Sequence, residues 1–461
     1  MTDFSSVQWD ETNSPEAQDQ SESSDSKLPV SGNAQSEDIG EGSSAHKSAP
    51  PTVSKDDIYF HCTITDPQKE QEGSQNAYIS YLLTTETNSP SFQKPVVHVR
   101  RRFSDFFYLY NALVNEFPAS IVPPLPDKNR LDYLKGDLRF GPEFTLKRAS
   151  SLTRFLTRIA RHPGLKKSRV FYTFLESDDW NSFKMHRGAA RLSTGGGQES
   201  NSFLEGISDT LLNAFSKVNN PSKEMTEVKE RGDKLETNLS SVEKNFTRVV
   251  RRQGDLVGDL EEFSAQVIKL AEIQPNLSVE FGEFAQGIQE FSRGVYLLKE
   301  HIDGDYIVSL RDMENYIVSL KSLLKLREQK QLDYEALTNY LSRSNRERDN
   351  LVAGGGSSFL RNKVEDFRGV DHERSRKERL SKLEARIEDL TREVTSAKQT
   401  SEMFEEVSIN EVQIFENIKE MEMKVTLDHL CDYYISFYKE MIKGWENIAK
   451  RLDGAQPMEA V

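Results

Sequence analysis

The sequence predicts a small α+β domain followed by an elongated all-α bundle of three long helices, with a polar tail in front of both. Three observations predict this architecture. Strand-like apolar runs alternate with turn residues before residue 103. Apolar residues then recur at alternating spacings of four and three along most of residues 222–453. Residues 1–54, in contrast, contain very few large apolar side chains.

The first segment is predicted to be disordered. Residues 1–54 are rich in Ser, Gln and acidic residues, with ten Asp/Glu against two Lys. Such a segment buries too little apolar surface to offset the entropy lost on ordering. The short end of the chain, residues 454–461, is predicted to be a second disordered tail. The whole chain is only 36% hydrophobic and has a mean hydropathy of -0.64, which agrees with sizeable segments outside any core.

Residues 55–182 are predicted to form the α+β domain. Its three strand-like runs are bounded by turn residues, which favours a three-stranded antiparallel sheet. Four helices are expected to follow, and Ser104 is expected to cap the first of them. In the third helix, Leu146, Leu152 and Phe155 are expected to point inward. The expected strands span 58–65, 77–85 and 94–102, and the expected helices span 104–117, 128–135, 143–162 and 168–175.

Residues 183–220 are predicted to be a linker. Its first part, residues 183–200, is rich in Gly, Ser and Arg and is expected to be flexible. Residues 202–218 place apolar side chains on one face at helical spacing, which predicts an amphipathic helix. Such a helix either lies in a membrane interface or packs between two domains, and the pattern favours neither strongly.

Residues 221–453 carry the long-helix pattern. The residues at alternate spacings of four and three from Leu235 to Leu270 are all apolar except Gln253. Pro275 interrupts this first helix, and the glycine-rich run 353–358 interrupts the second. The three helices therefore have roughly 50, 75 and 80 residues. An apolar seam of this length is typical of a coiled coil or long bundle, and we expect a second chain to complete it.

Charge and composition exclude several classes of protein. The net charge of -14 argues against bulk nucleic-acid binding. Residues 94–170, however, hold sixteen Lys/Arg and six Asp/Glu, which indicates a local anionic target such as lipid headgroups. The two cysteines, Cys62 and Cys431, lie far apart, so we expect a reduced, cytosolic protein without a metal site. No catalytic motif is found, so neither an enzyme nor a cofactor is predicted.

Three segments carry a resemblance to a known family. RRFSDF at 101–106, PPLPDK at 123–128 and KRASSLTRFL at 147–156 resemble the phox-homology (PX) domain in order and spacing. The long-helix region resembles a BAR domain. Together, residues 55–453 are similar to a sorting nexin of the PX-BAR type.

The resemblance implies a role for each motif residue. Arg102 stands where the family binds the 3-phosphate of an inositol lipid, and Phe103 stands at the aromatic that stacks on the inositol ring. Lys128 matches the cation that reaches the 1-phosphate. Arg148 matches the arginine that holds the 4- and 5-hydroxyls, which implies phosphatidylinositol 3-phosphate. Ser104, Arg101 and Arg130 are possible auxiliary residues, with Arg101 and Arg130 otherwise solvated.

The implied function is that of a non-enzymatic adaptor on the membrane of early endosomes. The family implies a homodimer or a heterodimer with another sorting nexin, cargo retrieval from endosomes to the Golgi, and contacts with the autophagy machinery, including at the preautophagosomal structure. A coiled-coil tether or scaffold that binds proteins without lipid specificity is the alternative reading of the same pattern.

Overall fold

A computed structural model describes residues 58–71, 77–126, 140–193, 222–353 and 372–454. The predicted disordered tails, the short helix at 128–135 and the amphipathic helix at 202–218 lie outside these residues. Within the described ranges, no helix is both long and apolar enough to cross a bilayer.

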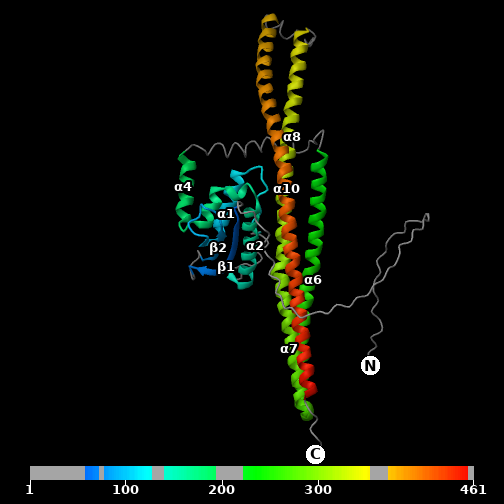
Figure 1. Cartoon of the computed structure of the whole chain (residues 1–461). Helices are drawn as coiled ribbons and strands as arrows, with labels where there is room; N and C mark the ends of the chain where they lie inside the picture. Colours follow the sequence, from blue (N-terminus) through cyan, green and yellow to red (C-terminus); the bar gives the residue numbers. More distant parts are fainter. Residues whose placement is uncertain (1–57, 72–76, 127–139, 194–221, 354–371, 455–461) are drawn as a thin grey trace, which may run out of the picture. The chain divides into compact units, whose positions relative to one another are not determined.

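A three-stranded antiparallel sheet opens the first domain, as predicted (Figure 1). It consists of β1 (Phe60–Glu70), β2 (Tyr78–Thr87) and β3 (Val96–Arg102), in the order β1-β2-β3. The register pairs Ser80 with Arg102, so the arginine run ends beside the start of β2. Helix α1 (Phe103–Glu116) follows β3 without an intervening loop.

The predicted cap of α1 is wrong. Helix α1 begins at Phe103, so Ser104 already lies in its first turn and cannot be the residue before the helix. Arg102 holds the cap position instead, and its backbone amide donates to the carboxylate of Asp105 over 3.0 Å. The Asp105 side chain thus fixes the geometry at which the strand turns into the helix.

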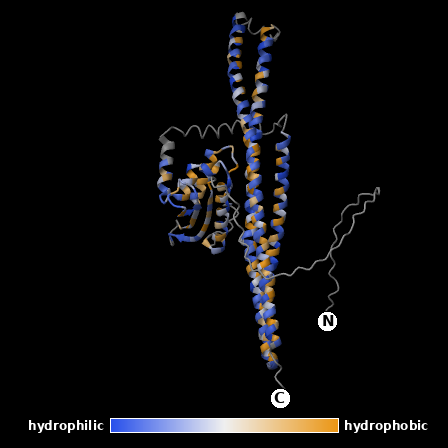
Figure 2. Ribbon diagram, viewed as in Figure 1, coloured by the Kyte–Doolittle hydropathy of each residue, from blue (hydrophilic) through white to orange (hydrophobic). Residues whose placement is uncertain are grey.

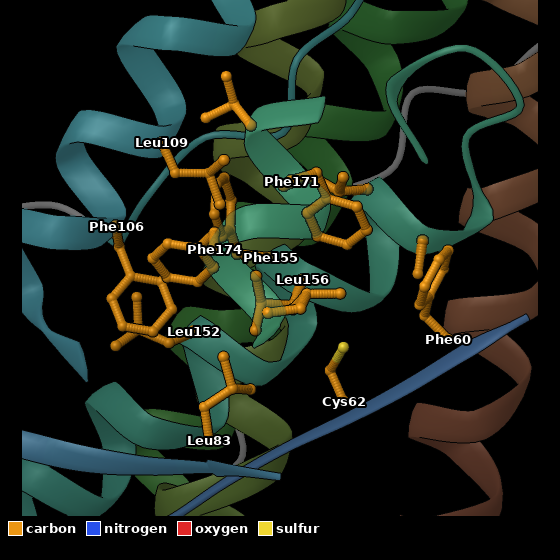
Figure 3. Close-up of a cluster of buried hydrophobic side chains, with 14 of the residues drawn as sticks. Phe60, Cys62, Leu83, Phe106, Leu109, Leu152, Phe155, Leu156, Phe171 and Phe174 are labelled. Atoms are coloured by element: carbon orange, nitrogen blue, oxygen red, sulfur yellow. The ribbon is translucent and has the colours of Figure 1, made fainter. Parts of the chain in front are cut away.

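Helices α2 (Pro142–Arg161) and α3 (Arg169–Glu176) complete the core of this domain. Figure 3 shows the aromatic side chains of α1, α2 and α3 gathered above the sheet, with Phe106 near Phe155 and Phe174. Leu152 and Phe155 point inward as expected. Leu146 is 57% exposed, which corrects that expectation. The buried face of α2 begins at Phe144, and Leu146 lies about 200° around the helix from it.

A further helix replaces the start of the predicted linker. Helix α4 (Trp180–Ser193) covers residues that we expected to be flexible from 183 onward. Trp180 is 2% exposed and makes edge-to-face contacts with Tyr108 and Phe174. Lys184 donates to Asp105 over 2.6 Å. These contacts attach α4 to the first domain, so the domain continues beyond residue 182.

Four long helical segments form the second part of the chain. They are α6 (Lys223–Ile273), α7 (Ser278–His301), α8 (Ile307–Val352) and α10 (His372–Gly454). The predicted breaks are confirmed: Pro275 stands between α6 and α7, and α8 ends at Val352. A π-helical turn, Ile302–Tyr306, joins α7 to α8, so these two make the single second helix that we expected.

The long helices pack as one bundle. Both α6 and α10 contact α7 and α8, and apolar residues recur along all of them (Figure 2). In the second long helix, the apolar residues that recur at alternate spacings of four and three from Tyr306 to Leu324 are all buried. Gly294 lets α10 approach closely, since a Cβ atom there would lie 2.5 Å from the Met441 Cε atom.

Candidate functional site

Arg148 is held between two aromatic rings at the start of α2. Its guanidinium carbon lies 4.5 Å from the ring centre of Phe103 and 4.4 Å from that of Phe144. Each stack is a cation–π contact, which favours a fixed orientation of the guanidinium plane. Tyr81 lies nearby: burial raises the pKa of Tyr81, and the positive charge of Arg148 partly opposes that rise. Arg148 is thus oriented before any ligand arrives.

Arg102 lies at the end of β3, next in the chain to Phe103. Its side chain is 46% exposed, and its guanidinium carbon lies 5.3 Å from the ring centre of Tyr78. The Arg102 Nε atom is 4.0 Å from the Asp105 carboxylate, which makes a loose ion pair. The turn into α1 fixes the backbone of Arg102, and the guanidinium group extends from this point into solvent.

The structure therefore brings together two of the predicted residues, Phe103 and Arg148, and Arg102 precedes Phe103 in the chain. Phe103 is half-buried and packs against the domain core, so the ring is a stable platform. Lys128 and Arg130 lie outside the described residues. The described chain reaches Pro126, two residues before Lys128.

The two auxiliary residues that the structure describes, Ser104 and Arg101, differ in their exposure to solvent. Ser104 is exposed in the first turn of α1, close to Phe103 in the chain. Arg101 is 3% exposed and donates to the backbone carbonyls of Phe174 and Ser177. Burial lowers the pKa of Arg101 to about 10. Arg101 is therefore a structural residue that anchors α3 and the start of α4, not a solvated or ligand-binding one.

Sequence reasoning missed a second set of charged residues on α2. Lys147, Arg154 and Arg158 pair with acidic residues of the long helices. Lys147 Nζ lies 2.5 Å from Asp303, and Arg154 Nε lies 2.7 Å from Asp312. The spacing of seven and four along α2 would have placed these cations on one face, which was the available signal.

Arg158 is the most deeply buried of these cations. It is 2% exposed, donates to both carboxylate oxygens of Glu422 on α10, and lies 4.5 Å above the ring of Tyr316. Burial alone would lower the pKa of Arg158, but the Glu422 carboxylate outweighs this effect and the pKa is raised. The pair is therefore largely removed from solvent.

Glu411 of α10 gathers three donors from the first domain. Its carboxylate accepts from the Ser120 hydroxyl over 2.9 Å, the Ile121 amide over 2.7 Å and the His162 ring over 3.1 Å. The His162 Nδ1 atom accepts from the amides of Gly164 and Leu165, so the ring carries its proton on Nε2 and donates it to Glu411. A buried carboxylate with three donors fixes the α2 end against the long helices.

The long helices carry an apolar stripe that the described chain leaves exposed. On α6 the predicted seam splits in two: Leu239 and Val267 are buried, while a second row is 36–50% exposed. We call this second row the α6 stripe; it consists of Val242, Val249, Leu256, Phe263 and Leu270. A regular apolar row of this kind is typical of an interface with another helix.

Comparisons with known proteins agree with this fold. Residues 89–178 match the PX domain model, and residues 198–451 match the model described as Vps5 C terminal like. The fold is similar to that in the cryo-EM structure of the SNX-BAR Mvp1 tetramer, with a TM-score of 0.52 and 18% sequence identity. The similarity covers 84% of this chain and 100% of the Mvp1 chain. At this identity the likeness concerns the fold alone.

Curated relatives are more similar in sequence. Sorting nexin-4 of Aspergillus fumigatus is 47% identical over 412 residues, covering 86% of this chain and 82% of the relative. Sorting nexin-4 of Saccharomyces cerevisiae is 38% identical over 407 residues, covering 86% of this chain and 94% of the relative. The sequence of residues 359–369 resembles fungal sorting nexin 4, an autophagy-related sorting nexin.

This chain belongs to the sorting nexin family, with a PX domain followed by a BAR-like domain of the Vps5 type. The predicted family is confirmed. Membership makes the protein a membrane-associated sorting adaptor of a non-enzymatic family, whose PX domain implies binding of phosphoinositide lipids.

Proposed function

We propose that the protein binds phosphatidylinositol 3-phosphate on early endosomes and recruits its BAR domain to that membrane. The observation that supports this most is the Arg148 guanidinium held against Phe103, with Arg102 next in the chain. An inositol headgroup offers phosphate, hydroxyls and an apolar ring face. These three residues supply a complement to each.

The chemistry of arginine favours this ligand. A planar guanidinium donates two parallel hydrogen bonds, either to a phosphate or to neighbouring hydroxyls. In the proposal, Arg102 binds the 3-phosphate, Arg148 binds the 4- and 5-hydroxyls, Phe103 supports the ring, and Lys128 reaches the 1-phosphate. Ser104 and Arg130 are auxiliary.

Dimerisation would raise the affinity for the membrane. One PX site and a few surface cations give only weak attachment, because each cation near an anionic surface contributes about 1 kcal/mol. Two sites on one rigid dimer bind together with a high effective concentration. The α6 stripe supports a dimer with a second copy or with another sorting nexin.

The cellular role is proposed from the Sorting nexin-4 relatives. We infer that the protein sorts cargo proteins from endosomes toward the Golgi and supports selective autophagy together with the autophagy machinery, partly at the preautophagosomal structure. Nucleic acid is not among the proposed partners, since the net charge is -14.

Vesicle flotation tests the lipid assignment. The wild-type chain should float with vesicles that contain phosphatidylinositol 3-phosphate and not with vesicles of unphosphorylated phosphatidylinositol. Arg102→Ala and Arg148→Lys should each weaken binding roughly tenfold, the latter because lysine keeps the charge and loses the two-pronged donor. The matched control is Arg169→Ala, which removes an exposed arginine of α3 in the same domain.

The flotation experiment also distinguishes the proposed function from the alternative. The headgroup assignment would be wrong if the wild-type chain bound vesicles with and without the 3-phosphate equally well, or if the two variants bound as well as the control. A tether or scaffold that binds only proteins would then be the better description.

A further inference from the structure

Phe144 contacts Arg148 but belongs to none of the three motif segments. It stands four residues before Arg148 on α2, a spacing that places two side chains on the same face of a helix. The guanidinium carbon of Arg148 lies 4.4 Å from the ring centre of Phe144, about as near as it lies to the ring of Phe103, at 4.5 Å. Two rings on different helices, α1 and α2, therefore contact one cation.

The ring of Phe144 is fixed by its surroundings. It is 7% exposed and lies in the first turn of α2. Pro142 at the start of that turn has a backbone angle already suited to a helix. The Thr145 amide and hydroxyl both donate to the Gly141 carbonyl, over 3.0 Å and 3.1 Å, which ties the turn to the residue before it. Arg148 thus lies over a ring that has little freedom to move.

An aromatic ring orients an arginine in a way that a carboxylate does not. The electron-rich face of the ring attracts the cation without taking up one of its N–H donors. Arg158 on the same helix instead donates to both carboxylate oxygens of Glu422. A ring contact therefore does not compete with a phosphate or a hydroxyl for these donors, as a carboxylate does.

Phe103 has two tasks in the proposed site, whereas Phe144 has one. Phe103 supports the inositol ring and also contacts Arg148, so its position must suit both. Phe144 is buried and contacts Arg148 from the same helix. A ligand that must first immobilise a long, flexible arginine binds more weakly than a ligand that meets an arginine already in place. We expect the ring of Phe144 to provide this order before the ligand binds.

We propose that Phe144 is a positioning residue for headgroup binding, which holds the Arg148 guanidinium in the orientation that binds two neighbouring hydroxyls of the inositol ring. The inference rests on the proposed function and adds to it a residue that acts through Arg148. The ligand chemistry is an inositol ring with a 3-phosphate, presented either by a membrane lipid or by a soluble headgroup.

The test removes the ring and keeps an apolar side chain in the full-length protein. Phe144→Leu should weaken binding of soluble inositol 1,3-bisphosphate, measured by calorimetry, and of phosphatidylinositol 3-phosphate vesicles by roughly three- to tenfold. The matched control is Phe155→Leu, which makes the same change at a core position of the same helix that is 1% exposed. It should lower the unfolding temperature and leave both affinities within about twofold.

Two outcomes of this comparison would overturn the proposal. Equal losses of affinity in Phe144→Leu and Phe155→Leu would show a general effect on the fold. A loss in Phe144→Leu that is seen with vesicles and not with the soluble headgroup would place the effect at the membrane surface instead of at Arg148.

A second measurement asks whether Phe144 acts through Arg148. The substitution Arg148→Lys leaves a compact cation without a plane that a ring could orient. In this background, the added substitution Phe144→Leu should change the affinity for either ligand by less than about twofold. A loss as large as in the wild-type background would mean that the two residues act independently, which contradicts a positioning role.

The two proposals fail differently. A wild-type chain with no preference for the 3-phosphate lipid would overturn the proposed function, and this inference with it. A wild-type chain that prefers this lipid, together with a Phe144→Leu variant that binds it as well as the wild type does, would overturn only the inference.

Discussion

Arg158 illustrates how a single residue joins the two domains. Its guanidinium is buried against Glu422 and Tyr316, and its Nη1 atom also donates to the Asp312 carbonyl over 2.9 Å. The desolvation of such a pair largely cancels its attraction, so the pair adds little net stability. Removal of one partner, in contrast, leaves a buried charge without compensation.

We therefore expect Arg158→Met to lower the free energy of unfolding by about 3 kcal/mol or more. The double variant Arg158→Met with Glu422→Met should recover most of this loss, because both charges leave together. Denaturant unfolding of the wild type, the two single variants and the double variant measures the coupling free energy between the two side chains. Losses that simply add would show that the two side chains do not interact in solution.

Helix α2 combines two tasks at the scale of the element. One turn carries Arg148, which is stacked for the proposed headgroup, and the adjacent face carries the cations that pair with the long helices. A single rigid helix therefore connects the proposed ligand site to the domain interface. Helix α4 has a different role, since Trp180 attaches it to the PX core.

The structure predicts that Trp180→Ala destabilises the PX domain by about 3–5 kcal/mol, because it leaves a cavity beside Phe174 and Tyr108. Thermal unfolding of the full chain measures the effect. Met185→Ala on the same helix is the control: Met185 is 76% exposed, and its loss should change stability by less than about 0.5 kcal/mol. Equal effects of the two substitutions would mean that α4 is not attached.

At the scale of the whole molecule, the α6 stripe is the proposed dimer surface. The double substitution Val249→Glu with Leu256→Glu should prevent dimerisation, because a dimer would bury each new charge against an apolar partner helix. Light scattering should then give the mass of one chain, 52.7 kDa, where the wild type gives twice that value.

The control places the same two charges about 180° around α6, as Thr247→Glu with Gly258→Glu, and should leave the dimer intact. The same measurement with other sorting nexins from the same cell tests a heterodimer. A wild-type chain that stays at 52.7 kDa alone and in every mixture would contradict a role of the stripe in assembly.

The sequence allowed much of this architecture to be predicted, because sheet and long helices follow from local periodicity. The runs ending at Arg102 and the row from Leu235 to Leu270 each repeat at the period of their element. The domain interface could not be predicted in this way. Arg158 and Glu422 are 264 residues apart, and no local pattern links them. Helix α4 was missed because its stability depends on Trp180 packing against other helices, whereas Lys128 remains a prediction.

The π-helical turn has a geometric consequence for the molecule. It accommodates one residue more than an α-helical turn, and Asp303 and Asp305, which bind Lys147 and Arg154 of α2, both lie within it. Deletion of one residue there would leave a regular α-helix with its α7 and α8 sides in nearly the same rotational phase, and would remove the wide turn that presents these two aspartates. A single additional amino acid in the second long helix thus shapes the acidic surface on which α2 is docked.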